Sequence, residues 1–445
     1  MTARVLEVSI NGQAVGQLTE NDTLWQFEYT PGWAASAQGF DLSPALERRA
    51  GALRDGASMR PVQWYFDNLL PEEALRTLLA KEAGIDADDA FSLLARFGAE
   101  SAGALELRLP GDAAPRPQGL RPLPLAALNQ RILDLPHVSL THDAPKKMSL
   151  AGAQHKLLAV WQNGTLFEPL PATPSTHILK PEHRAAGYPA SVMNEYFTMR
   201  LAAAVGLNVP AVQRLYAPAP VYLVERFDRM ATSGAQPQRR HIIDTCQLLN
   251  KACSFKYTAA RLQTLADGVA RCRSRAAARL RLYQWVVFNL LVGNGDNHLK
   301  NISFTVDTQG INLAPFYDLL CTAVYETPAM ADPRATWPAT PLAMGLDGAD
   351  TFAQVTRDHV LHAGGVLGLA HATARRELDR LLHNLPDAAA RLASEIEAGM
   401  PQALAASPDP IAAQAHAGGE LRLLRAIRHV IIEPMCVQLA ARTTG

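Results

Sequence analysis

The sequence lacks an excess of charge of either sign, since its 42 Lys and Arg residues are matched by 42 Asp and Glu residues. No overall basic field therefore favours nucleic acid, and any contact with DNA is expected to come from a local patch or from a partner protein. Cysteine is also scarce. The five cysteines form no C-x-x-C pair, and an odd number fits reduced thiols in the cytoplasm.

The marks of secretion, of membrane insertion and of a zinc site are missing as well. The N-terminus has no charged segment followed by an apolar one, which predicts no secretory leader. The longest apolar run, near Trp285, is too short to span a bilayer, and the 13 histidines form no H-x3-H or Cys/His set for zinc. We therefore expect a cytoplasmic protein without membrane contact, whose 445 residues form two or three domains.

The first 110 residues predict a small α+β subdomain. Residues 4–30 alternate between apolar and polar types on both sides of Asn11-Gly12, a dipeptide typical of tight β-hairpins. Residues 61–98 place apolar side chains at helical spacing, and residues 104–109 return to a strand pattern. Because this region has no acidic or histidine cluster of its own, we expect residues 1–110 to be an accessory subdomain that binds or supports and does not catalyse.

A stretch rich in proline and glycine, residues 111–124, predicts a linker into a β-rich region that extends to about residue 235. In this region we expect strands and helices in alternation, with Ser191 as the N-terminal cap of the last helix. The expected elements are a helix over 125–135, strands over 157–161, 176–180 and 221–225, and a helix over 191–206. Helical periodicity then dominates residues 236–445, with helices expected over 262–282, 282–292, 361–382, 392–405 and 421–441.

A dense polar cluster follows the apolar run 282–292 and the glycines that end it. Asn301 lies five residues after Asp296, and Asp318 follows two short strand-like pieces. This spacing is typical of a phosphotransferase, in which the first Asp orients the acceptor hydroxyl while the Asn and the second Asp hold magnesium against the ATP phosphates. Oxygen ligands suit magnesium because it is a hard cation. A polar turn between a buried helix and a hairpin explains the same residues equally well, since D-x4-N is common by chance.

Two further patterns are compatible with nucleotide binding. Small residues with flanking lysines over 146–156 precede a strand and could let backbone N–H groups approach phosphates, although a flexible polar loop is the simpler interpretation. Lys180 ends a predicted strand and Glu195 lies near the start of the next helix, as in the Lys–Glu pair of kinases. A surface lysine and an acid favoured by the helix dipole explain this second pattern more simply.

Taken in chain order, the motifs are more specific than any one of them alone. The N-terminal region contributes Trp25-x-Phe-x-Tyr29, Asn68-Leu-Leu-Pro71 and Gly103-Ala104. The later motifs are Ser149-Leu-Ala-Gly-Ala-Gln154, Thr176-His-Ile-Leu-Lys180, Asn194-Glu195, Glu225-Arg-Phe-Asp-Arg229, Asp244-x-x-Gln247, Gly293-Asn-Gly-Asp-x-His-x-Lys-Asn-x-Ser303 and Phe316-Tyr-Asp318. Over nearly the whole chain, this ordered set strongly resembles the HipA-type serine/threonine protein kinases, toxins of bacterial toxin–antitoxin pairs.

The resemblance implies a role for each motif residue. Asp296 would be the catalytic base, Asn301 and Asp318 would hold Mg²⁺, and Ser149 would be an autophosphorylation site. Glu195, Asp228, Asp244 and Gln247 would support the site. The residues implied to bind ATP are Ala151, Gly152, Ala153, Gln154, His155 and Lys156 in a phosphate loop, the phosphate-binding Lys180, the adenine-binding Glu225, Arg226 and Phe227, and His298, Lys300, Asn301, Tyr317 and Asp318 at the phosphates and metal. His155 departs from the family, in which Glu is common at this position, and leaves the electrostatics of the loop open.

The resemblance also implies an α+β, two-lobe protein kinase-like fold with an extra N-terminal subdomain (1–110), a β-rich ATP lobe (111–235) and an all-α C-terminal lobe (236–445). The implied reaction is transfer of the ATP γ-phosphoryl to a protein serine. Family members characterised as toxins modify aminoacyl-tRNA synthetases. A helix-turn-helix antitoxin of the HipB type neutralises such a toxin, and DNA would be contacted mainly through the antitoxin. Two alternatives stay open: a non-catalytic co-repressor that binds the antitoxin, and a small-molecule phosphotransferase.

Overall fold

The computed structural model of the protein describes residues 3–112, 116–148, 150–152, 154–232, 235–331 and 335–441. The chain has the expected mixed α+β architecture and forms two compact units, each assembled from separate stretches of sequence. The first unit comprises Met1–Leu179, Glu225–Lys256 and Ser303–Ala314, and the second comprises Lys180–Val224, Tyr257–Ile302 and Pro315–Gly445.

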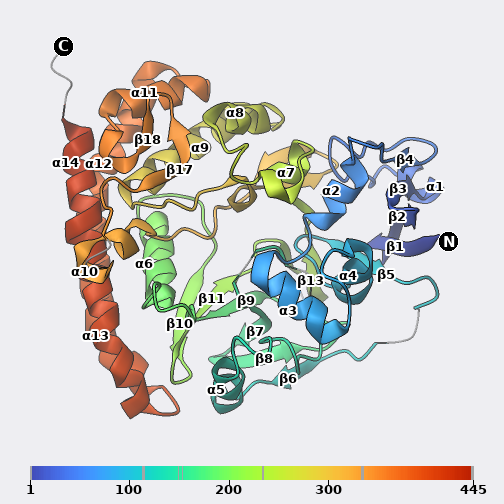
Figure 1. Ribbon diagram of the computed structural model, residues 1–445, viewed down its shortest axis with the longest axis horizontal. Helices are drawn as coiled ribbons and strands as arrows, with labels where there is room; N and C mark the ends of the chain where they lie inside the picture. Colours follow the sequence, from blue (N-terminus) through green and yellow to red (C-terminus); the bar gives the residue numbers. More distant parts are fainter. Residues whose placement is uncertain are drawn as a thin grey trace. The chain divides into compact units, whose positions relative to one another are not determined.

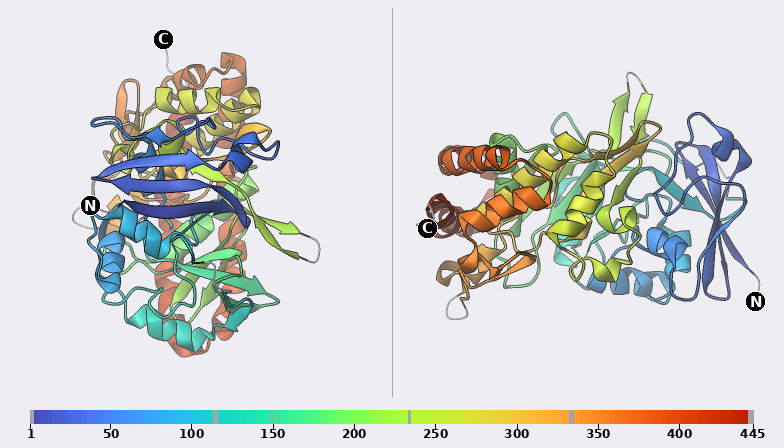
Figure 2. Two further views of the ribbon diagram at one scale, coloured as in Figure 1. Left: turned by 90° about the vertical axis from the view of Figure 1, so that its right-hand side faces the viewer. Right: turned by 90° about the horizontal axis from the view of Figure 1, so that it is seen from above.

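The N-terminal region of the first unit is built on an antiparallel sheet with strand order β4-β3-β2-β1-β5. The three long blue strands in the left view of Figure 2 are β1, β2 and β3, side by side. Asn11 (φ 48°) and Gly12 (φ 79°) form the tight turn of the first hairpin, as the dipeptide predicted, because both occupy the left-handed region that this turn requires. The strands are β1 (Arg4–Ile10), β2 (Gln13–Asn21), β3 (Leu24–Tyr29), β4 (Leu53–Arg54) and β5 (Leu105–Arg108).

Helices cover one face of this sheet because alternate strand residues supply an apolar surface there. Phe66 of α2 packs with its ring centroid 5.5 Å from that of Phe27 on β3. Phe91 of α4 meets Trp25 edge-on at 5.3 Å. All four side chains are fully or almost fully buried, so the expected helical region 61–98 folds back onto the first hairpin. The helices of this region are α1 (Pro31–Ala35), α2 (Pro61–Asp67), α3 (Glu73–Ala83) and α4 (Ala90–Phe97).

The remainder of the first unit consists of short antiparallel strands and three short helices. In it β7 pairs with both β8 and β9, β12 pairs with β13, and the order of the last three strands is β14-β15-β16. The elements are β6 (Leu120–Pro122), α5 (Leu125–Leu133), β7 (Leu157–Gln162), β8 (Thr165–Pro169), β9 (His177–Pro181), β12 (Arg229–Thr232), β13 (Ala235–Arg239), β14 (Ile242–Asp244), α7 (Thr245–Leu248), η1 (Cys253–Phe255), β15 (Ser303–Asp307) and β16 (Gly310–Leu313). The last two residues of β9, Lys180 and Pro181, belong to the second unit.

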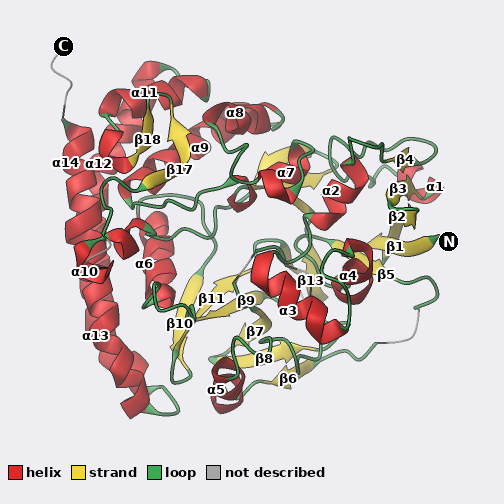
Figure 3. Ribbon diagram, viewed as in Figure 1, coloured by secondary structure: helices red, strands yellow, loops and turns green. Residues whose placement is uncertain are grey.

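The second unit is mainly helical, as the red ribbons of Figure 3 show. Its longest helix, α12, runs through Pro386 and Pro401. Figure 1 shows α13 and α14 as one continuous rod, which the π-helical turn η5 (Ile427–Ile432) joins. The other elements are α6 (Ser191–Ala204), β10 (Val212–Tyr216), β11 (Pro220–Glu225), α8 (Leu262–Ala270), α9 (Arg275–Leu291), η2 (Leu299–Asn301), η3 (Ala323–Glu326), α10 (Pro328–Ala331), β17 (Pro341–Leu346), β18 (Ala349–Thr351), η4 (Phe352–Gln354), α11 (Arg357–Val366), α12 (His371–Ala405), α13 (Pro410–Ala426) and α14 (Glu433–Ala440).

The structure refines three expectations about helices and strands. Residues 236–445 are mostly helical, as expected, but they also contain the strands β14 to β18. The helix expected over 262–282 is interrupted between α8 and α9. Ser191 is not the cap of α6 but its first residue, and Glu182 Oε2 accepts hydrogen bonds from the Ser191 backbone N and Oγ, both at 2.8 Å. Within the described ranges, no helix is both long and apolar enough to cross a membrane.

Candidate active site

The turn after α9 projects Asp296 from a buried framework. The last turns of α9 bury large side chains such as Trp285 and Phe288, and the helix is followed by Gly293 at φ 66°. A Cβ atom at Gly293 would lie 2.8 Å from Ile431, so the turn is packed too tightly for a side chain. Asn294 then uses its Oδ1 atom to accept a hydrogen bond from the Asp296 backbone N, at 3.0 Å. The apolar helix therefore fixes the polar cluster in place.

Asp296 and Asn301, which the sequence spacing paired, are in direct contact. The Asn301 amide donates to the backbone carbonyl of Asp296 at 2.9 Å, and Asn301 is buried. Because the amide nitrogen is committed to this bond, the Oδ1 atom is the group that remains for a cation. His298 and Lys300 lie between the two residues and are also buried.

Sequence reasoning missed Tyr257, which precedes α8. Its hydroxyl donates to Asp296 Oδ1 at 2.7 Å, and its ring meets that of His298 edge-on, with centroids 4.9 Å apart. Its side chain is 44% exposed. The only signal in the sequence is a lone tyrosine in a polar stretch, which does not identify a partner 39 positions away.

Asp318 lies in a loop that several hydrogen bonds attach to the rest of the second unit. Its φ of 59° is unusual for a residue other than glycine, and such backbone strain is concentrated at functional sites. On one side, the Tyr317 hydroxyl donates to the carbonyl of Lys300 at 2.7 Å. On the other side, the Asn194 side chain exchanges two hydrogen bonds with the backbone of Cys321, at 2.7 and 2.8 Å. The loop is thus held against both α6 and the 296–301 segment.

Lys180 connects two of the expected acids. Its Nζ atom lies 2.8 and 3.0 Å from the two carboxylate oxygens of Glu195 on α6 and 2.6 Å from Oδ1 of Asp318. Lys180 and Glu195 are both buried. Burial lowers the pKa of Lys180, but Asp318 and Glu195 outweigh this effect and raise the pKa above its usual value. Lys180 is therefore a permanent cation between two carboxylates.

The expected phosphate loop belongs to the first unit. The Lys156 ammonium donates to the carbonyl of Ala151 at 2.5 Å, and Gly152 has a φ of 106° that favours glycine. Gln154 and His155 are both half-buried. Ser149 and Ala153 lie outside the residues that the structure describes.

The segment expected to face adenine, 225–227, also belongs to the first unit. Glu225 is exposed and Phe227 is half-buried, whereas Arg226 is buried and directs its guanidinium to Asp228, at 2.7 and 2.9 Å. Burial raises the pKa of Asp228, but Arg226 and Arg229 outweigh it and lower the pKa to about 2. The Arg226 side chain is therefore committed to an ion pair, and its backbone N donates to the carbonyl of Thr176 at 2.9 Å.

Asp244 and Gln247, expected to support the site, have a structural function. They form a reciprocal capping box at the start of α7: Gln247 N donates to Asp244 Oδ1 at 2.8 Å, and Asp244 N donates to Gln247 Oε1 at 2.9 Å. Gln247 also donates to the carbonyl of Tyr65 at 2.9 Å, which anchors α7 to the C-terminal half of α2.

The donor set of the second unit fits magnesium better than a softer metal. Asn301 and Asp318 offer an amide and a carboxylate oxygen, and magnesium is held in proteins by one or two such groups together with substrate phosphates. Among the described residues, no group of three or more His, Cys, Asp or Glu side chains could hold a metal ion by itself. Lys180 beside Asp318 adds the positive charge that a phosphate would require.

Two family models match the chain. One describes a HipA N-terminal domain and matches residues 6–108, and the other describes a HipA-like C-terminal domain and matches residues 148–391.

Curated relatives and a solved structure give the same result. Y4mE of Sinorhizobium fredii, whose name places it among the kinases, is 37% identical over 88% of this chain and 92% of its own. The serine/threonine-protein kinase toxin HipA of Shewanella oneidensis is 34% identical over 72% of this chain and 76% of its own. The solved complex of HipA, HipB and operator DNA from Shewanella oneidensis MR-1 matches with a TM-score of 0.74 at 28% identity, over 97% of this chain and 99% of that one.

Proposed function

The chain belongs to the HipA family, and from this premise we propose that it is an ATP-dependent serine/threonine protein kinase and the toxin of a toxin–antitoxin pair. One observation carries the proposal: Lys180 is bound to both Glu195 and Asp318, while Asp296 and Asn301 are hydrogen-bonded in the same unit. A charged lysine held by a helix acid, next to an acid suited to magnesium, is the arrangement that positions ATP phosphates in kinases.

In the proposed reaction, the Asp296 carboxylate accepts the proton of the acceptor hydroxyl as its oxygen attacks the γ-phosphorus. The new O–P bond forms while the bond to the β,γ-bridging oxygen breaks, and ADP leaves. Asn301 and Asp318 would hold Mg²⁺, which would supply charge neutralisation on the phosphates. Lys180 contributes a fixed positive charge, and Glu195 keeps this lysine in place. Catalysis of this kind comes mostly from positioning and electrostatics.

The proposed partners follow from the family. We expect an antitoxin of the HipB type, because the matched Shewanella oneidensis structure is a complex of HipA with HipB and operator DNA. DNA would then be contacted mainly through the antitoxin. The proposed acceptor is a protein serine, with an aminoacyl-tRNA synthetase as the family precedent, and Ser149 would be the self-modified residue.

The proposal is tested by incubating the purified protein with a cell lysate and ATP labelled in the γ-phosphate. A labelled protein band that requires magnesium and disappears in Asp296→Asn supports a protein kinase. A labelled small molecule would instead indicate a small-molecule phosphotransferase. No label at all, together with tight binding of the antitoxin, would indicate the non-catalytic co-repressor.

A further inference from the structure

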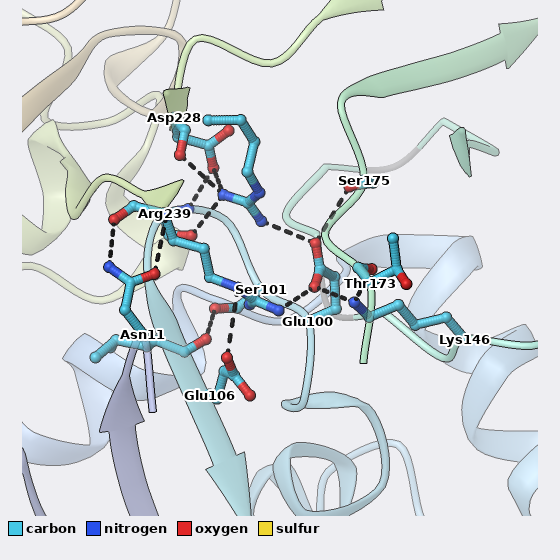
Figure 4. Close-up of polar contacts among 12 residues, drawn as sticks. Asn11, Glu100, Ser101, Glu106, Lys146, Thr173, Ser175, Asp228 and Arg239 are labelled. Carbon is cyan, nitrogen blue, oxygen red and sulfur yellow. Dashed lines mark hydrogen bonds and ion pairs between the residues drawn. The ribbon is translucent and has the colours of Figure 1, made fainter. Parts of the chain in front are cut away.

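The first unit contains a buried carboxylate that is surrounded by cations. Glu100, between α4 and β5, is fully buried. Its Oε2 atom lies 2.8 Å from Lys146 Nζ and 2.6 Å from Arg239 Nη2. Its Oε1 atom lies 2.8 Å from Arg229 Nη2 and 3.2 Å from Arg226 Nη1. Figure 4 shows Lys146 and Arg239 approaching Glu100 from opposite sides.

The cluster joins the N-terminal region to both segments of this unit that are expected to contact nucleotide. Lys146 begins the stretch that leads into the phosphate loop, and it also donates to the carbonyl of Thr173 at 2.8 Å. Arg226 lies in the segment expected to face adenine, and it donates to the carbonyl of Ser101 at 3.0 Å. The four cations therefore all form ion pairs with one acid, which belongs to the first 110 residues.

Apolar and backbone contacts connect the same two regions. Met148 and Leu150, on either side of Ser149 in the sequence, are buried and form a small core with Leu158 and with the partly buried Ala102. Further along the loop, the carbonyl of Gly152 accepts a hydrogen bond from the Glu72 backbone N at 3.4 Å. The described part of the loop thus rests on residues 72, 100 and 102 of the N-terminal region.

We propose that Glu100 is a positioning residue for nucleotide binding, through which the N-terminal region braces the phosphate loop and the adenine segment. The proposal rests on the proposed function, in which residues 151–156 and 225–227 contact ATP. It makes the N-terminal region a part of the nucleotide site, and it provides a physical route by which a protein bound to that region changes ATP affinity.

The electrostatics of the cluster explain why the brace depends on this acid. Burial lowers the pKa of Lys146 to about 8, and Glu100 is the group that opposes this effect most. Replacing Glu100 with glutamine would leave Lys146 and three arginines around a neutral group. Arg226 and Arg229 would still pair with Asp228, and Arg239 with Glu106, whereas Lys146 would lose the acid that it pairs with. A buried cation that loses its counter-ion is destabilised and draws in water. Lys146 begins the stretch that leads into the phosphate loop, so the release of its ammonium would loosen that stretch.

The test compares Glu100→Gln with Glu168→Gln in the full-length protein. Glu168 on β8 is a matched control because it is also almost fully buried and bound to two arginines, Arg121 at 2.6 Å and Arg131 at 2.7 Å. Arg121 also donates to the carbonyl of Asp143, which precedes the stretch that begins at Lys146. Both variants should have a lower melting temperature. Only Glu100→Gln should raise the Kd for MgATP, about tenfold, and speed hydrogen exchange of the backbone amides over 147–152.

A folded Glu100→Gln protein that binds MgATP as tightly as the wild type would refute the role of Glu100. An equal loss of MgATP affinity in Glu168→Gln would refute it as well. If Glu100→Gln does not fold, Lys146→Met replaces it as the test variant. This substitution removes the lysine of the same ion pair and leaves Glu100 with three arginines. Unchanged MgATP affinity in Lys146→Met would likewise refute the proposal. Failure of the wild type itself to bind MgATP would refute the proposed function, and the brace with it.

Discussion

The Tyr257 hydroxyl donates a hydrogen bond to Oδ1 of Asp296 over 2.7 Å, in the same unit as Lys180, Asn301 and Asp318. A carboxylate has two oxygens and can accept several hydrogen bonds. With Oδ1 held by Tyr257 and the Asp296 carbonyl held by Asn301, the orientation of the acid is restricted from two sides. We expect the acceptor hydroxyl to meet the Asp296 carboxylate in this orientation.

We predict that Tyr257→Phe lowers kcat about three- to tenfold and leaves the Kd for MgATP within about twofold. A three- to tenfold loss corresponds to about 0.7–1.4 kcal/mol. This is less than the roughly 1.5–3 kcal/mol of a hydrogen bond to a charged group, because Tyr257 is exposed and water can replace its hydroxyl. The ring, and with it the contact to His298, is retained. Tyr188→Phe, at another exposed tyrosine of the second unit, is the control and should leave both values unchanged. An unaltered kcat in Tyr257→Phe would contradict the role of Tyr257 in orienting Asp296.

A second prediction separates the two acids of the site by the step that they affect. Asp296→Asn should lower kcat by at least 100-fold while MgATP still binds, because general-base catalysis contributes about this much and the residue faces the acceptor. Asp318→Ala should weaken magnesium-dependent ATP binding itself, since it removes a metal ligand and the acid that is 2.6 Å from Lys180.

Equilibrium binding of ATP with and without magnesium, together with the rate of label transfer, distinguishes these roles. Asp267→Asn, at an exposed aspartate of α8, serves as the control for the loss of a negative charge. The assignment is wrong if Asp296→Asn loses MgATP binding as severely as Asp318→Ala does.

The parts of the fold that were predictable from sequence depend on short-range patterns. The Asn11-Gly12 turn, the helices over 61–98 and the contact of Asp296 with Asn301 all follow from residues a few positions apart. Tyr257 was missed because its partner Asp296 is 39 positions away, and Glu100 because its partners are both remote and numerous. Glu100 has no distinctive neighbour in the sequence, yet it collects cations from positions 146, 226, 229 and 239. Only the tertiary structure brings such charges together.

The third prediction concerns self-modification at Ser149, which lies outside the described residues. We expect the wild-type protein to acquire phosphate at Ser149 when incubated with MgATP and to lose kinase activity, whereas Ser149→Ala stays active. A phosphoserine adds about −1.5 to −2 charges next to a loop meant for ATP phosphates, and like charges repel. Mass spectrometry locates the phosphate, and ATP titration measures the loss. Equal ATP affinity of the fully phosphorylated and the unmodified protein would rule out such a switch.

The last prediction uses Glu182, which accepts the hydrogen bonds of Ser191 at the start of the Glu195-bearing helix α6. Burial is the main cause that raises the pKa of Glu182 from 4.5 to about 7, and the charge of Glu420 adds to it, while the Ser191 hydroxyl opposes the shift. The folded state therefore holds this proton more tightly than the unfolded state does. The resulting stabilisation is complete below pH 4.5 and is lost as the pH rises through 7.

Glu182→Gln should accordingly raise the melting temperature at pH 8, where the wild-type carboxylate is charged, and should have little effect at pH 5, where it is protonated. A gain of about 2–4 °C at pH 8 corresponds to about 1 kcal/mol for a unit of this size. Glu397→Gln, at an exposed glutamate of α12, is the control and should show no difference between the two pH values. Thermal unfolding of the three proteins at both pH values makes the comparison. A melting temperature that falls at pH 8 in Glu182→Gln would mean that the ionised carboxylate stabilises α6, contrary to the raised pKa.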